Sequence, residues 1–215
     1  MHRRRRTALL LAATLATAAP LLTACGDEAH PGAAAVVGDD RITVSQLENR
    51  VNEVRTAQRA AITDDAQYEQ AIAQSGGLTR EILNNMVLDR VLHSAAQDAG
   101  VTVSRKEVTK VRSELEDQPG GVEQLERDWL QTYGIPPERI DENLRLQLEA
   151  QKLAAQLGTD TSGPAFWKAL SDASKKLDVD LNPRYGTWDP EKNSRVEAKL
   201  PWLRQVTQAG SQETA

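Results

Sequence analysis

Histidine, cysteine and clustered carboxylates are the side chains that could do chemistry in this sequence, and they are sparse. The chain has 215 residues, three histidines and one cysteine. It contains no cysteine pair, no His-x-x-x-His and no acidic calcium-binding loop, so we expect no metal and no cofactor. The glycine pairs Gly76-Gly77 and Gly120-Gly121 are interpreted as helix breaks, because neither GxxxxGK nor GxGxxG is present.

His93 is the one histidine available for a hydrolytic triad. His2 lies in an N-terminal leader and His30 in a polar, turn-rich segment. His93 lies on the flank of an apolar helical stripe, where a structural or solvated role is the simpler interpretation. The carboxylate clusters Asp64-Asp65 and Glu114-Glu116-Asp117 are interpreted as solvated helix ends. The sequence therefore predicts a protein that is not an enzyme.

Cys25 is the one nucleophile whose neighbours indicate a modification. Four arginines, Arg3 to Arg6, precede an apolar run over residues 8–22. This pattern is typical of a secretory signal peptide and is too short for a transmembrane helix. The run ends in Leu22-Thr23-Ala24-Cys25, which resembles a bacterial lipobox. The resemblance implies cleavage between Ala24 and Cys25 and a diacylglycerol thioether on Cys25. A plain signal peptide followed by an accidental cysteine is the alternative.

The lipobox interpretation divides the N-terminal region and places the protein. We expect residues 1–24 to be a signal peptide and residues 25–33 a lipidated tether at the outer face of a bacterial cytoplasmic membrane. Removal of four arginines changes the net charge from −5 to −9. Such an acidic chain offers no basic footprint, so no nucleic-acid partner is expected. A single cysteine also excludes an intrachain disulfide.

Apolar residues spaced by three and four predict helices through most of residues 34–190. An aromatic content of only 4% favours the same fold class. Thr43 with Gln46 and Ser104 with Glu107 have the spacing of capping boxes, and Ser162 is expected to cap a later helix. Residues 64–77 are expected to form a short helix or a loop. The other predicted helices cover residues 44–62, 78–99, 105–118, 122–133 and 138–157 and the segment after Ser162.

Two segments at opposite ends of this region are β-prone. Residues 33–43 place two β-prone pieces on either side of Gly38-Asp39-Asp40, which predicts a hairpin. Residues 176–188 begin with alternating apolar and polar residues, which predicts one half-buried strand. Because a lone strand leaves backbone groups unsatisfied, we expect it to pair with the hairpin and close the domain. The expected members of this clasp are Val36, Val37, Ile42, Val179, Leu181, Tyr185 and Trp188. Residues 191–215 are expected to be a partly disordered extension.

Two long segments resemble the N-terminal chaperone domain of the SurA/PrsA foldase family. They read AAVVGDDRITVSQLENRV and LTREILNNMVLDRVLHSAAQDAGVTVSRKEV. Ala35 to Thr43 matches the family's Ala-Val-x-Asn-Gly-x-x-Ile-Thr start, with Gly38-Asp39 in place of Asn-Gly, and Met86 to Val108 matches the block that follows. The resemblance covers about residues 34–185. It implies a mainly α, multi-helix SurA N-like domain with a small antiparallel sheet.

Many members of that family also carry a parvulin prolyl isomerase domain. That domain uses about ninety residues of mixed sheet and helix with characteristic histidines, and no segment here resembles it. The three histidines leave no pair to build its site. The resemblance therefore implies a chaperone-like domain without isomerase activity.

The family resemblance implies that unfolded or newly exported polypeptides lie in a groove between helical arms. Met86, Trp129 and Tyr133 are the candidate contact residues, because methionine and aromatic side chains adapt to varied apolar partners. Core packing is the simpler interpretation of the same residues. We expect a membrane-tethered chaperone of the holdase type with no small-molecule substrate. The alternative is a structural or adaptor lipoprotein that docks one envelope partner. A solute-binding lipoprotein is disfavoured, because alternating strands and helices are missing.

Overall fold

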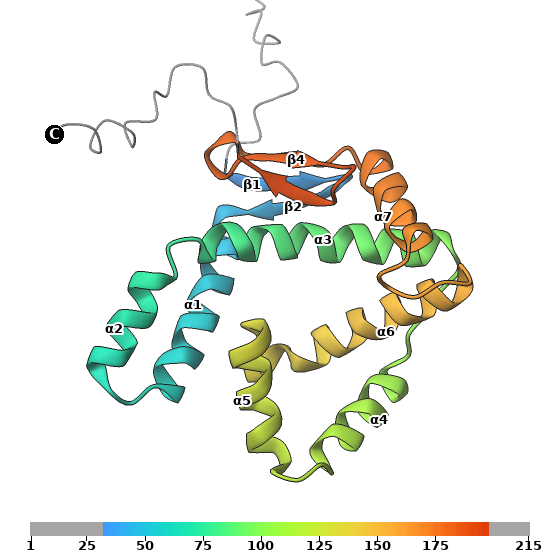
Figure 1. Ribbon diagram of the computed structural model, residues 1–215. Helices are drawn as coiled ribbons and strands as arrows, with labels where there is room; N and C mark the ends of the chain where they lie inside the picture. Colours follow the sequence, from blue (N-terminus) through green and yellow to red (C-terminus); the bar gives the residue numbers. More distant parts are fainter. Residues whose placement is uncertain (1–31, 198–215) are drawn as a thin grey trace, which may run out of the picture. The chain divides into compact units, whose positions relative to one another are not determined.

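A computed structural model describes residues 32–197 of the chain, and Cys25, the expected cleavage site and residues 198–215 lie outside the described residues. Seven α-helices and two small antiparallel sheets make up this described part (Figure 1). The helices are α1 (Val44–Ala61), α2 (Asp65–Gln74), α3 (Leu78–Asp98), α4 (Arg105–Glu116), α5 (Gly121–Tyr133), α6 (Ile140–Gln156) and α7 (Pro164–Lys176). Over residues 32–197, every helix is too short or too polar to cross a bilayer.

The first sheet joins the two ends of the domain. Its strands are β1 (Ala33–Val37), β2 (Asp40–Thr43) and β3 (Asp180–Leu181), in the order β2-β1-β3. Ala35 of β1 lies opposite Ile42 on one side and Leu181 on the other, and both pairings are antiparallel. The predicted pairing of an N-terminal hairpin with a C-terminal strand is therefore confirmed.

Gly38 explains how the hairpin turn approaches the C-terminal segment. Its φ of 59° lies in the left-handed region, and a Cβ there would lie 3.0 Å from the side chain of Leu177. The Gly38 amide donates to the carbonyl of Leu177 at 2.7 Å. Glycine tolerates both the conformation and the close contact. The hairpin turn and the end of α7 thus meet backbone to backbone.

The closing strand is shorter than the sequence predicts. Helix α7 continues to Lys176, and Asp178 then turns the chain with a φ of 46°. Only Asp180 and Leu181 pair with β1. The residues before them form the end of α7 and the turn at Asp178, so they are not part of the strand. Leu177 and Val179 are partly buried against the main core, so their side chains face the core as predicted.

Two aromatic residues beyond β3 pack against the main core. Tyr185, in the 3₁₀ turn η2 (Pro183–Tyr185), is 9% exposed and belongs to the core cluster. Trp188 is partly buried against the same cluster, and its Nε1 donates to Ser174 Oγ at 2.6 Å. Of the other expected clasp residues, Val37, Ile42 and Leu181 are buried, whereas Val36 and Val179 are partly buried. The C-terminal aromatics therefore attach the sheets to α7.

A second hairpin follows the closing strand. It consists of β4 (Thr187–Asp189) and β5 (Ser194–Val196), so residues 191–197 of the expected extension belong to the folded part. The amide of Arg195 donates to Asn84 Oδ1 of α3 at 2.8 Å. This contact joins the hairpin to the central helix.

Local capping signals were largely reliable. Thr43 and Ser104 form the predicted capping boxes with Gln46 and Glu107. The prediction for Ser162 is wrong, because α7 begins at Pro164 and Ser162 instead hydrogen-bonds to Asp160. Helix α6 also starts later than predicted, since Pro137–Arg139 form a 3₁₀ turn, η1, before it.

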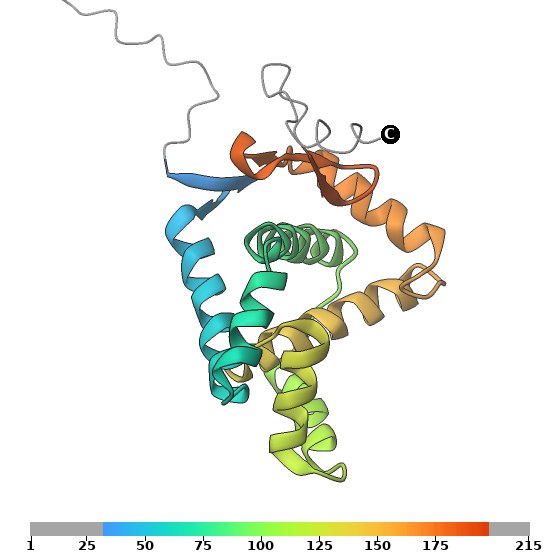
Figure 2. The same cartoon turned by 60° about the vertical axis from the view of Figure 1, so that its left-hand side comes forward.

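Helix α3 lies at the centre of the domain. Figure 2 shows it nearly end-on, with the sheets on one side and α1, α6 and α7 around it. Its apolar face contributes Leu83, Val87 and Val91 to the main core. A smaller core around Ile140 and Leu144 joins α6 to α4 and α5. Helices α1–α2 and α4–α5 form two arms on the same side of α3 (Figure 1).

Candidate functional site

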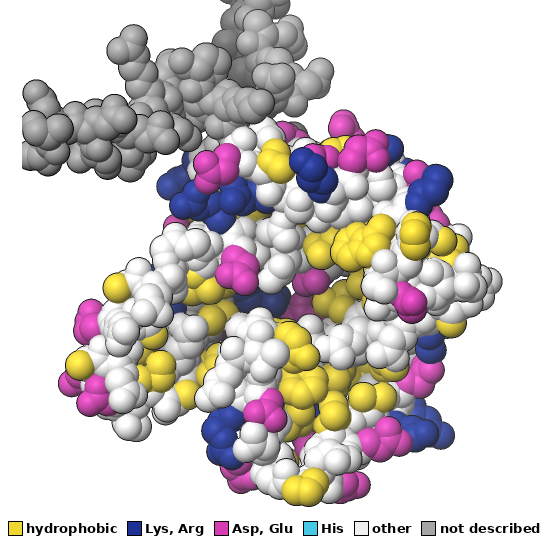
Figure 3. Space-filling view, in the orientation of Figure 1, with side chains coloured by type: hydrophobic (Ala, Val, Ile, Leu, Met, Phe, Trp, Pro, Cys, Tyr) yellow, Lys and Arg dark blue, Asp and Glu magenta, His cyan; other side chains and the backbone are white. Residues whose placement is uncertain are grey.

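A groove lies between the two arms, with α3 as its floor. It has an outer section of about 690 Å³ and an inner section of about 460 Å³. Residues from α1, α3 and α6 line both sections, so the two sections are continuous. Figure 3 shows the hollow between the arms, with hydrophobic side chains at its edges and charged ones deeper inside.

The outer section has walls of mixed polar and apolar side chains, and four helices contribute the apolar ones. The principal apolar lining residues are Val54, Ile82, Met86, Leu130, Tyr133 and Leu146. The Tyr133 side chain is the most open of these, because 56% of its residue surface is exposed. An apolar wall that leaves an aromatic ring in solvent can bury a further apolar partner with a gain in free energy.

The three predicted contact residues occupy different positions relative to the groove. Met86 lines both sections although it is only 7% exposed, so it serves the core and the groove together. Tyr133 lines the outer section. Trp129 is not among the residues that line either section. It packs against the smaller core, donates Nε1–H to Asn143 Oδ1 at 3.1 Å and contacts Tyr133 edge-to-face at 5.7 Å. Trp129 therefore supports Tyr133 from outside the groove.

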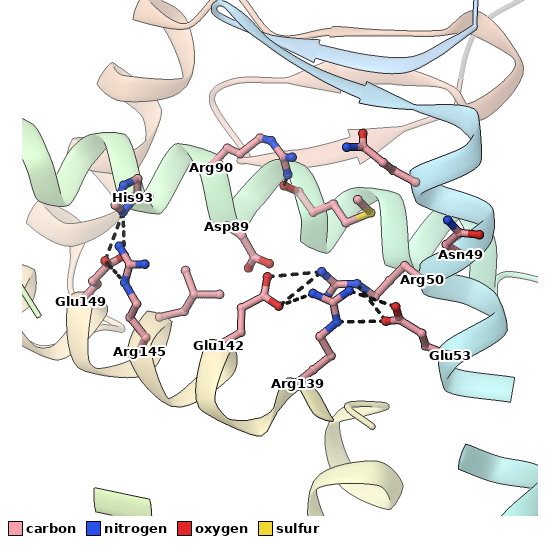
Figure 4. Close-up of a pocket in the computed structure, with 13 residues that line it drawn as sticks. Asn49, Arg50, Glu53, Asp89, Arg90, His93, Arg139, Glu142, Arg145 and Glu149 are labelled. Carbon is pink, nitrogen blue, oxygen red and sulfur yellow. Dashed lines mark hydrogen bonds and ion pairs between the residues drawn. The ribbon is translucent and has the colours of Figure 1, made fainter. Parts of the chain in front are cut away.

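The inner section contains a network of arginines and glutamates that connects the arms (Figure 4). Arg139 Nε donates to Glu53 at 2.9 Å, and its Nη1 donates to Glu142 at 2.7 Å. Arg50 of α1 also reaches Glu142, at 3.3 Å. The hydrogen bond from Arg139 holds the pKa of Glu53 below its usual range. Burial raises the pKa of Glu142, but the bonds and charges of Arg139 and Arg50 outweigh it and leave that pKa lowered.

A second polar cluster joins α3 to α6 around Glu149, which is 3% exposed. His93 Nδ1 lies 3.1 Å from Glu149 Oε1, and Arg145 Nε donates to the same oxygen at 3.1 Å. Gln97 lies 2.9 Å from the other ring nitrogen of His93. Both nitrogens of His93 therefore have partners, and neither partner is the serine or cysteine of a triad. The cluster stabilises a helix contact and does not have the arrangement of a catalytic triad.

Asp89 differs from the other charged groove residues. It projects from α3 toward Glu142 (Figure 4), and within residues 32–197 its carboxyl has no hydrogen bond or ion pair. Burial raises the pKa of Asp89 to about 7, and the nearby charge of Glu142 adds to the effect. Arg50 and Arg90 oppose this increase without cancelling it. Asp89 is thus a carboxyl whose ionisation the groove disfavours.

The sequence analysis did not predict the charged residues that line the inner section of the groove. Met86, Asp89, Arg90 and His93 are spaced by three and four positions and therefore share one side of α3. That spacing was the available signal, but it does not identify Glu53, Arg139 or Glu142 as neighbours. In the described part of the chain, no three of the histidine, cysteine and carboxylate side chains are arranged so that they could hold a metal ion together.

Comparison with known families supports the interpretation drawn from the fold. A family model described as the SurA-like N-terminal domain matches residues 2–154. The chain belongs to the SurA-like N-terminal domain family. No curated protein and no solved structure matches it. The match extends from before the N-terminal hairpin almost to the end of α6, so it includes every element that lines the groove. Membership gives this SurA-like domain a chaperone-like role in protein folding.

Proposed function

We propose that this SurA-like domain is a holdase that binds unfolded or newly exported polypeptides in the groove. In this proposal the lipid on Cys25 tethers it to the extracytoplasmic face of the membrane, and it performs no prolyl isomerisation. The observation that carries the proposal is the outer section, a groove of about 690 Å³ between two helical arms in which apolar side chains alternate with polar ones. Its size lies within the usual range for sites that enclose a ligand of several side chains.

The chemistry of the walls suits a partner without a fixed sequence. Met86 is flexible and polarisable, and Tyr133 offers a large apolar face with a polar tip. Each apolar side chain that a client buries contributes about 1.5 to 3 kcal/mol relative to its exposed state. Such contacts depend on area more than on direction, so they accept many sequences. This matches the needs of a holdase.

The ion pairs suit the same function by fixing the helices around the inner section. Arg139 joins η1, at the base of the second arm, to Glu53 on the first arm. A bidentate pair constrains direction as well as distance, so these elements are preorganised. A preorganised groove does not have to be formed anew for each client, which lowers the cost of binding.

Aggregation suppression by residues 26–215 tests the proposal. The protein is mixed with several unrelated proteins diluted from denaturant, and light scattering is followed. We expect Tyr133→Ser to weaken suppression and Trp167→Ser to leave it unchanged. Both are exposed aromatics, at 56% and 43%, but only Tyr133 lines the groove. If no client is protected and a single envelope protein co-purifies stoichiometrically, the adaptor alternative is correct.

Isomerase activity is a separate question with its own assay. We expect residues 26–215 to leave the cis–trans rate of a proline-containing model peptide unchanged. Rate acceleration that purifies with the protein would contradict the absence of enzymatic activity.

The tether rests on the lipobox sequence Leu22-Thr23-Ala24-Cys25. We expect wild-type protein in the membrane fraction, and mass spectrometry of its N-terminal peptide to show a diacylglycerol on Cys25. Cys25→Ser should lack this mass and remain unprocessed. A wild-type chain that is soluble and unmodified after export would contradict the tether but not the groove.

A further inference from the structure

Asp89 lies where the two sections of the groove meet. It lines both the inner and the outer section, as Met86 does one turn earlier on α3. Its carboxyl therefore borders both sections, close to the apolar side chain of Met86. A client in the outer section would pass close to this carboxyl.

The arginines of the groove are already occupied by other partners. Arg50 and Arg139 bind Glu53 and Glu142, and Arg145 binds Glu149. Arg90 binds the carbonyl of Met86 and the side chain of Asp40. None of the four donates a hydrogen bond to Asp89 within residues 32–197.

The charge balance of the groove is negative for the same reason. Its lining contains four arginines and five carboxylates, counting Glu81 at the outer section. Within the described residues, Glu81 also has no ion pair. The uncompensated charge is therefore acidic and lies beside apolar walls. An approaching cation gains free energy here, whereas an approaching carboxylate loses it.

Asp89 is partly buried, so keeping an unpaired carboxyl at this place costs some stability by reducing its contact with water. An amide or an apolar residue would avoid the cost without disturbing α3. Residues that break local rules in this way are concentrated at functional sites. A cation would be the natural partner of the Asp89 carboxylate, and none of the arginines that line the groove binds it.

We propose that Asp89 receives a lysine or arginine of the bound polypeptide, so that the groove prefers apolar segments that carry a basic residue. The inference rests on the proposed function, since it assigns a chemical class to the client. Apolar side chains of the client would contact Met86 and Tyr133 while its cation pairs with Asp89. Acidic segments would be disfavoured by Asp89 and Glu142 together.

Three labelled peptides of equal length test the preference by fluorescence anisotropy. They share apolar flanks and differ at a central position, which is arginine, glutamine or glutamate. With residues 26–215 at pH 8, we expect the arginine peptide to bind about tenfold more tightly than the glutamine peptide, and the glutamate peptide to bind most weakly. Asp89→Asn should reduce the arginine advantage to about twofold or less and leave the glutamine peptide unchanged. Asp117→Asn, an exposed position outside the groove, is the matched control and should behave as wild type.

The pH dependence provides a second readout that a structural role would not change. Since the pKa of Asp89 is raised to about 7, its carboxyl is more fully ionised at pH 8 than at pH 6. The arginine advantage should therefore grow over this range in wild type and stay flat in Asp89→Asn. The titratable and charged groups around Asp89 are Arg90 and His93 from α3, Arg50 and Glu53 from α1, Arg139 from η1, and Glu142 and Glu149 from α6.

The outcomes separate the two proposals. If no peptide binds, the holdase function and the charge preference both fail. If all three bind equally, the groove binds peptides but the preference is wrong. An arginine advantage that survives in Asp89→Asn also overturns the assignment to Asp89.

Discussion

Arg139 binds the carboxylate of Glu53 through two parallel hydrogen bonds, from Nε to Oε2 at 2.9 Å and from Nη2 to Oε1 at 3.0 Å. Glu53 belongs to α1, and Arg139 to the turn that precedes α6 (Figure 4). The pair therefore connects the first arm to the base of the second, beside the inner section of the groove. Because a bidentate pair constrains direction as well as distance, it fixes α1 relative to η1.

Arg139→Met removes this connection, and we expect it to lower the free energy of unfolding by about 1 to 2 kcal/mol. The lower part of the range reflects the partial exposure of both side chains. Arg139→Lys should recover little of the loss, because an ammonium cannot form two parallel bonds. Urea denaturation measures both variants. Arg105→Met, at an exposed site, is the control. Full stability in Arg139→Lys would mean that charge alone holds the arms.

Leu181 tests whether the short strand β3 closes the domain. It is 4% exposed and belongs to the main core. Leu181→Ala should cost about 2 to 4 kcal/mol, since the cavity lies between elements from the two ends of the domain. Val122→Ala, at 40% exposure on α5, should cost about 0.5 kcal/mol or less. Thermal melting followed by circular dichroism compares them. Deletion of residues 177–188 should abolish the cooperative melt, and its persistence would refute the clasp.

Asp89 should make stability depend on pH in an unusual direction. Its pKa in the folded state, about 7, lies above the ordinary aspartate pKa of 3.8. The folded state therefore holds a proton between these values that the unfolded state has released. Stability from this group increases as pH falls from 8 towards 4 and is lost as pH rises through 7. We expect Asp89→Asn to be more stable than wild type at pH 8 and to show a smaller difference at pH 5. Chemical denaturation at both values measures this, and equal differences would contradict it.

Ser104 tests the capping box at the start of the second arm. Its Oγ accepts the amide of Glu107 at 3.3 Å, and its amide donates to the Glu107 carboxylate at 2.8 Å. Ser104→Ala should cost about 1 kcal/mol. Ser113→Ala, the same substitution at an exposed position of α4, should be neutral or slightly stabilising. Equal stability of the two variants would show that the cap contributes nothing.

Glu107 makes the stability that the same capping box contributes depend on pH in the acid range. The hydrogen bond from Lys152, followed by those of Ser104, lowers the pKa of Glu107 to about 2. A lowered folded pKa contributes stability above the unfolded value of 4.5, and this contribution is lost as pH falls towards 2. Glu107→Gln should therefore flatten the decline in stability between pH 5 and pH 2. An unchanged decline would exclude Glu107 as its source.

Much of the helical architecture could be predicted from local sequence. The boxes at Thr43 and Ser104 and the apolar stripe of α3 are short-range signals, because caps and helix faces depend on residues within one or two turns. The pairing of the hairpin with the C-terminal strand was also predictable, since a lone strand cannot satisfy its backbone. The length of that strand was not, because α7 continued through Lys176 into the alternating segment.

Part of the candidate site could likewise be predicted from the sequence, and part required the tertiary structure. Sequence alone identified Cys25 as a lipidation candidate, since a lipobox is a contiguous motif that needs no fold. It also selected Met86 and Tyr133 by residue type, but it could not separate them from Trp129, because groove and core require the same side chains. Only the tertiary structure decided which arginine meets which glutamate, and that Asp89 meets none. These pairings depend on how α1, α3 and α6 pack, and charge interactions act over distances in space that the order of residues does not encode.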